Sequence, residues 1–174
     1  MISITESINR VKHFARLERI LAMVCITAPA MMIIGDNGTV RDSISAYYDM
    51  VKSVLYYVPL TVAFMLFVVN GVIKKQKAYN TILGVFLAGL VLFNHEYFPY
   101  LHFTFAALFF LGNAVVMVIF TSKTELWFKA ILVAIIASAL GAWGLGLISL
   151  FWAEWVSLGI IGWHYILESW GVID

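Results

Sequence analysis

Side chains that could do chemistry gather in three segments of this sequence. Residues 36–49 carry acids and hydroxyls, residues 94–102 carry two histidines and an acid, and Glu154 stands near two tryptophans. Carboxylates and imidazoles supply the oxygen and nitrogen ligands that zinc prefers, and a positioned carboxylate can act as a general base. The three segments therefore predict either a metal-dependent hydrolytic site or a set of helix caps.

Each segment contributes residues to the predicted hydrolytic site. The predicted catalytic residues are Asp42, Ser43, Ser45 and Glu154. The predicted metal ligands are His102, His95 and Glu96, with zinc as the expected ion. A bound metal would activate water and polarise the carbonyl of a lipid ester or amide. The spacing matches no established zinc motif, so the alternative stays open that Asp42 caps a short helix and His102 is structural.

A second pair of ionisable residues lies near the C-terminus. His164 stands within the last apolar segment and Glu168 follows one helical turn later. Ionisable residues at depth in an apolar segment indicate function, here a channel or proton path. The alternative is a neutral histidine that bonds an oxygen of another helix.

The composition is that of a membrane protein. The 174 residues are 63% hydrophobic and only 12% charged, with a mean hydropathy of +0.94. A soluble domain of this size has far fewer apolar and far more charged residues. The net charge of +1 offers nothing to attract nucleic acid, so nucleic-acid binding is not expected.

Hydrophobic runs predict an all-α fold, a polytopic transmembrane bundle that forms a single domain over residues 1–174. Residues 1–17 read as an amphipathic interfacial helix, or as an extension of the first span. The predicted spans are 18–35, 54–73, 79–97, 101–121, 126–151 and 154–171. Five spans with a C-terminal interfacial helix are the main alternative.

Basic residues predict the orientation. Of the 11 lysines and arginines, all but Arg41 and Lys52 fall on the side of the N-terminus in this six-span arrangement. Cytoplasmic loops of membrane proteins carry the excess of lysine and arginine. We therefore expect a protein of the bacterial inner membrane with both termini on the cytoplasmic side. The three polar segments then share the outer membrane face.

Small residues recur at every fourth position of the fifth predicted span. The stripe consists of Ala130, Ala134, Ser138, Ala142 and Gly146. Such a stripe lets another helix approach closely. It predicts packing either within the bundle or against a second copy or a partner subunit.

The run Arg41-Asp-Ser-Ile-Ser-Ala-Tyr-Tyr48 resembles a segment of uncharacterised small bacterial six-helix membrane proteins. The similarity continues at 101–110 and 151–155. The resemblance implies a six-helix fold and points to Asp42, Ser43, Ser45, Tyr47, Tyr48, His102 and Glu154. More distantly, acids, hydroxyls and histidine at helix ends resemble alkaline ceramidases and adiponectin receptors, which are metal-dependent membrane hydrolases.

The sequence therefore leaves three alternative functions. The first is a polar, metal-binding site for membrane lipid at the outer face, with or without hydrolysis. The second is an accessory or oligomer-forming subunit that uses the small-residue stripe. The third is a channel that uses His164 and Glu168.

Overall fold

The computed structural model describes residues 4–173, and of residues 1–13 and 75 it describes no side chains. The predicted polar and apolar faces of the N-terminal amphipathic helix therefore lie outside the described part. The described chain forms six α-helices and two short 3₁₀ helices, with no strand among residues 4–173. They are α1 (Ile4–Gly35), η1 (Ser45–Asp49), α2 (Val54–Ile73), η2 (Lys75–Lys77), α3 (Tyr79–Leu92), α4 (Pro99–Ile119), α5 (Leu126–Gly144) and α6 (Leu150–Ser169).

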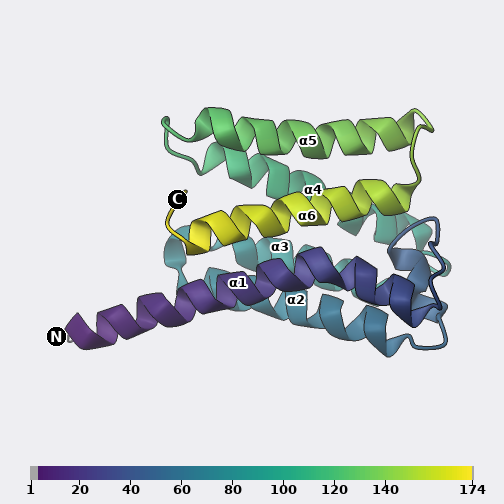
Figure 1. Ribbon diagram of the computed structural model, residues 1–174, viewed down its shortest axis with the longest axis horizontal. Helices are drawn as coiled ribbons and strands as arrows, with labels where there is room; N and C mark the ends of the chain where they lie inside the picture. The colour runs from purple at the N-terminus through teal and green to yellow at the C-terminus, as the bar shows by residue number, and fades with distance from the viewer. Residues whose placement is uncertain (1–3, 174) are drawn as a thin grey trace.

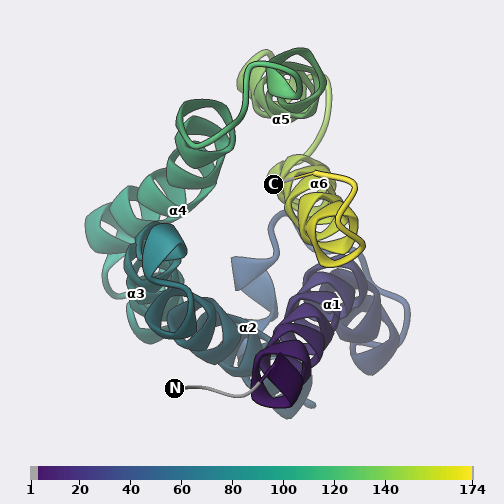
Figure 2. The ribbon, with the colours of Figure 1, turned by 90° about the vertical axis from the view of Figure 1, so that its left-hand side faces the viewer.

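The six helices run up and down and form a ring. Viewed along the helices, α1 to α6 follow one another around the ring, and α6 closes it against α1 (Figure 2). Of the neighbouring pairs, α4 and α5 pack least closely. Figure 1 shows the start of α1 and the end of α6 at the same end of the bundle, which we call the terminal end. The opposite end, with residues 36–53, 93–98 and 145–149, is called the loop end.

The helices have the surface of a membrane protein. Four of them, α1, α2, α4 and α5, contain stretches long and apolar enough to cross a membrane. Large apolar side chains such as Val72, Val115 and Ile119 are exposed on the outside of the bundle. Contiguous exposed apolar surface of this extent needs lipid as its solvent. Helix α3, with 14 residues, is about 21 Å long and shorter than the hydrocarbon layer.

Several helix ends differ from the predicted ones. Helix α1 is continuous from Ile4 to Gly35, so residues before 18 extend the first apolar helix. Helix α3 ends at Leu92, five residues before the predicted 97. Helix α5 ends at Gly144 rather than at 151, because the chain turns at Gly146 with a φ of +72°. The prediction that Gly146 extends the helical stripe is therefore wrong.

Helix α6 begins at Leu150, four residues earlier than predicted. Glu154 consequently lies one turn inside the helix and is 6% exposed. The alternative that Glu154 is a helix cap is thus wrong, because the N-cap residue of α6 is Ser149. The earlier start places its side chain among the helices.

Glycines set how closely two helix pairs approach. A Cβ on Gly84 of α3 would lie 2.9 Å from the Phe64 carbonyl oxygen of α2. A Cβ on Gly162 of α6 would lie 2.9 Å from the Ala22 carbonyl oxygen of α1. Both distances are shorter than real Cβ contacts, so only glycine fits where these backbones meet.

Candidate functional site

Arg41 organises the segment between α1 and α2. Its Nε donates to Asp36 at 2.7 Å, and its Nη1 donates to the Ala46 carbonyl at 2.6 Å and also bonds Asp49. The hydrogen bond to the Asp36 carboxylate raises the pKa of Arg41. One guanidinium thereby holds the beginning, the middle and the end of the segment together.

Tyr47 anchors this segment to the bundle. Its side chain is fully buried, and its hydroxyl donates to the Thr39 carbonyl at 2.7 Å and accepts from the Arg41 amide at 3.1 Å. Burial raises the pKa of the Tyr47 phenol. Its ring packs 5.8 Å from that of Phe151 at the start of α6. The segment with η1 therefore lies inside the ring of helices at the loop end (Figure 2).

The predicted catalytic residues separate into an inner and an outer group. Glu154 Oε2 accepts a hydrogen bond of 2.7 Å from the buried Ile44 amide. Ser43 and Ser45 flank that amide and are buried, with their hydroxyl oxygens 3.0 Å apart. Ser43 Oγ also accepts from the Ala46 amide at 3.2 Å. The N-cap residue of η1 is Ile44, so the prediction that Asp42 caps this short helix is wrong.

Asp42 does not join the inner group. Asp42 is exposed, and its backbone carbonyl accepts a hydrogen bond of 2.8 Å from the Phe151 amide. Asp42 therefore connects the segment between α1 and α2 to α6 by a backbone hydrogen bond. Asp42 thus lies apart from Glu154, whereas Ser43 and Ser45 flank the Ile44 amide that Glu154 binds.

The turn between α3 and α4 lies against the same segment. Tyr48 bonds Glu96 through its hydroxyl, which raises the pKa of Tyr48, and its ring meets that of His95 edge-on at 5.5 Å. His102 is 2% exposed, and its Nδ1 donates to the Phe93 carbonyl at 2.8 Å. The His95 and His102 rings lie 5.8 Å apart. The three polar segments thus meet at the loop end.

The predicted metal ligands are not arranged as a metal site in the described structure. Within residues 4–173 no three His, Cys, Asp or Glu side chains are grouped so that they could hold a metal ion. His102 bonds a backbone carbonyl and Glu96 bonds Tyr48. His95 Nδ1 is buried without a hydrogen-bond partner among the described groups.

A large cavity joins His102 to Glu154. It lies between α4, α5 and α6 and has a volume of about 550 Å³. Both polar residues line it, although both are almost completely buried. Its walls are otherwise apolar and consist of Phe103, Ala106, Ala107, Phe110, Leu111, Leu140, Trp143 and Leu150. The cavity and the two polar residues at its end form the loop-end site.

A second polar cluster, of which the sequence predicted only Glu168 as a functional residue, lies at the terminal end. Lys77 of η2 pairs with Glu18 of α1 at 3.4 Å and with Glu168 of α6. The members of this terminal-end network also include Asn70, Asn80 and Tyr165. The Asn80 side chain donates to Asn70 at 2.7 Å and accepts from the Tyr165 hydroxyl at 2.9 Å.

One sequence signal could have found this network. Glu18 and Asn70 are polar residues within or beside apolar helices, where each must have a partner. Glu18 is 2% exposed and Asn70 is 1% exposed. The distribution of basic residues predicts that Lys77 is a cytoplasmic flanking charge. Its side chain is instead buried between two carboxylates.

The small-residue stripe of α5 points away from the chain's own helices. Ala130, Ala134 and Ser138 are exposed, and Ala142 is half-buried. The buried face of α5 consists instead of Lys129, Leu132, Ile136 and Ala139. The prediction that the stripe packs within the bundle is therefore wrong.

The chain matches the family described as "Family of unknown function (DUF7103)" over residues 25–169. It belongs to that family. The matched range contains the Arg41 segment, the turn between α3 and α4, and α6 up to its last residue. No curated protein and no solved structure matches the chain. The segment motif shared with small bacterial membrane proteins stays a prediction, because the match is to the family as a whole.

Proposed function

We propose that this membrane protein binds an amphiphile in the loop-end site, with the ligand's hydrocarbon chain between α4 and α5 and its polar end at Glu154 and His102. The observation that carries the proposal is the cavity of about 550 Å³ that both residues line. Cavities of roughly 300–1,000 Å³ with mostly apolar walls and few polar groups are typical of small-molecule sites.

The apolar walls favour a hydrocarbon chain as the occupant. The cavity lies between α4 and α5, the two neighbouring helices that pack least closely. Both helices also expose apolar side chains, such as Leu108 on α4 and Ile135 on α5. In a membrane this opening faces acyl chains rather than water. A lipid chain can then enter sideways without leaving the hydrocarbon layer.

The polar end sets the headgroup chemistry. A buried carboxylate is costly unless hydrogen bonds or an opposite charge compensate it. Glu154 receives the Ile44 amide, and no lysine or arginine lines the cavity beside it. A headgroup with hydroxyl or amine donors would supply the missing bonds. We therefore infer a ligand whose polar end donates hydrogen bonds.

The distribution of basic residues supports the outer leaflet as the source of the ligand. Arg16, Arg19, Lys74, Lys77 and Lys123 belong to the terminal end, whereas the loop end has Arg41 and Lys52. By the positive-inside rule the loop end then faces away from the cytoplasm.

Native mass spectrometry of the protein extracted in mild detergent tests the proposal. Ala106→Phe places a ring in the cavity and is expected to remove the retained lipid. Ala137→Phe makes the same change on the exposed face of α5 and should retain it. Glu154→Gln keeps an acceptor for Ile44 and should weaken the preference for donor headgroups. Equal lipid retention by Ala106→Phe and Ala137→Phe would contradict the proposal.

A second candidate function rests on the exposed stripe of α5. Ala130, Ala134 and Ser138 leave a flat helix face toward the membrane, where small residues favour helix association. We propose a second copy of the chain as the partner. Ala134→Leu should then convert a dimer into a monomer in light scattering, and a wild-type monomer of 19.6 kDa would refute it.

A further inference from the structure

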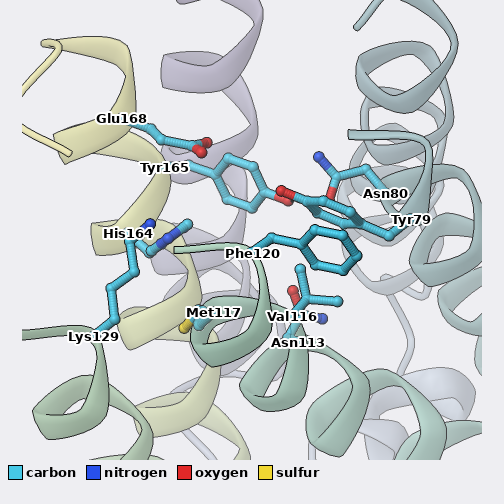
Figure 3. Close-up of a pocket in the computed structure, with 10 residues that line it drawn as sticks. All are labelled: Tyr79, Asn80, Asn113, Val116, Met117, Phe120, Lys129, His164, Tyr165 and Glu168. Atoms are coloured by element: carbon cyan, nitrogen blue, oxygen red, sulfur yellow. The ribbon is translucent and has the colours of Figure 1, made fainter. Parts of the chain in front are cut away.

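A small polar pocket lies at the terminal end, well away from the amphiphile cavity. Figure 3 shows His164, Tyr165 and Glu168 reaching from α6 toward Tyr79 and Asn80 of α3. Asn113 of α4 and Lys129 of α5 complete its polar lining. Its volume is about 10 Å³. One water molecule needs about that much space, so the pocket excludes any larger ligand.

Two buried polar atoms at this pocket have no hydrogen-bond partner among the described groups. They are Nε2 of His164 and Oε2 of Glu168. His164 is 8% exposed and the Glu168 side chain 4% exposed. The two residues are four positions apart on α6, so their side chains share one helix face. An unsatisfied buried polar atom costs about 1–3 kcal/mol, so a partner that bonds both atoms would stabilise the site.

We propose that one water molecule bridges His164 Nε2 and Glu168 Oε2, and that the two side chains bind a single exchangeable proton through it. A water has two O–H groups, and a deprotonated imidazole nitrogen and a carboxylate oxygen are both acceptors. One water therefore satisfies both atoms.

Proton uptake needs only a rearrangement of these hydrogen bonds. The incoming proton binds the lone pair of His164 Nε2, and the new N–H donates to the water oxygen. The water continues to donate to Glu168 Oε2, and release of the proton reverses the change. No other bond forms or breaks.

The charges that face the pair are balanced. The facing acids and bases are Glu18 of α1, Lys74 after α2, Lys77 of η2, and Glu125 and Lys129 beside and within α5. The facing phenols are Tyr79 of α3 and Tyr165 of α6. With Glu168 itself, three acids oppose three lysines. Because no excess fixed charge holds the proton in place, the pair can gain and lose it reversibly.

The proton has a route to solvent at the terminal end. Glu168 also lines an open groove of about 620 Å³ with Phe14, Lys74 and Trp170. Toward the loop end, the buried Leu158 and Ile161 separate His164 from Ser157. The site therefore exchanges protons with the terminal side.

The histidine protonation state tests the shared proton. The protein is labelled with ¹⁵N-histidine, and the His164→Gln spectrum assigns the His164 signals among the four histidines of the chain. At a pH where His164 is half imidazolium, Glu168→Gln is expected to reduce that fraction several-fold. Glu18→Gln is the matched control, because it removes the other carboxylate of Lys77 but does not line the pocket. Equal His164 protonation in wild type and Glu168→Gln would overturn the proposal.

The bridging water is tested separately. Infrared difference spectra between high and low pH should contain an O–H band that shifts in H₂¹⁸O. His164→Phe, which fills the pocket with an apolar ring, should abolish the band. Persistence of the band in His164→Phe, or its absence from the wild type, would overturn the bridge. Neither measurement depends on whether the loop end binds an amphiphile.

Discussion

The two ends of the bundle bury ionisable side chains in different ways. At the loop end Glu154 is bonded to a backbone amide, and the polar groups border a cavity of about 550 Å³. At the terminal end Lys77 of η2 pairs with Glu18 of α1 and with Glu168 of α6, beside a pocket of about 10 Å³. The difference agrees with the two proposals, a ligand site at the loop end and a proton-exchange site at the terminal end.

The largest effect on stability is expected from the terminal-end network. Lys77→Met would leave Glu18 and Glu168 buried without their cation. Breaking a buried ion pair by removing one partner costs about 3–5 kcal/mol. The free energy of unfolding, from denaturant titration in detergent, should fall by that amount. The exposed Lys123 provides the control, and Lys123→Met should change stability by less than about 0.5 kcal/mol.

A smaller loss is expected where α1 and α6 meet. Gly162→Ala places a Cβ 2.9 Å from the Ala22 carbonyl, which forces the helices apart and should cost about 1–3 kcal/mol. Gly159→Ala is the matched control on the same helix, since a Cβ there meets no atom within 4 Å. Thermal melting of both variants in detergent compares them directly, and an equal effect of the two would contradict the close approach.

The smallest stability effect is expected at the loop end. Tyr47→Phe removes the hydroxyl that joins Thr39 to Arg41 and should cost about 0.5–1.5 kcal/mol. Tyr48→Phe removes the bond to the exposed Glu96 and should cost less. If both losses matched that of Lys77→Met, the contrast between the two ends would not hold.

The sequence predicted the helices better than the contacts between them. Helix α2 has the bounds 54–73 expected from its apolar run, because charged residues flank both sides of that run. The end of α5 was missed because hydropathy does not register a backbone turn at Gly146. Helix boundaries set by backbone conformation leave little trace in a hydrophobicity pattern.

The candidate site could be predicted in part. The meeting of three polar segments at one end followed from the alternation of helices, and the structure brings Ser43, His95 and Glu154 to that end. Glu154 is buried because α6 begins at Leu150, and hydropathy did not predict that start. Asp42, in contrast, is exposed. The terminal-end network escaped prediction because Glu18 and Lys77 read as flanking charges. Their burial depends on the closure of the ring by α1 and α6.

Photo-crosslinking tests the central claim most directly. A lipid with a diazirine near the middle of its acyl chain and a hydroxyl-bearing headgroup is incorporated into vesicles with the protein, and labelled residues are mapped by mass spectrometry. We expect labelling to be concentrated on cavity residues such as Phe103, Leu111 and Trp143, and to be lost in Ala106→Phe. Labelling of Met65 and Val69, exposed on α2, to the same extent would show only general lipid contact and would contradict a ligand site at the loop end.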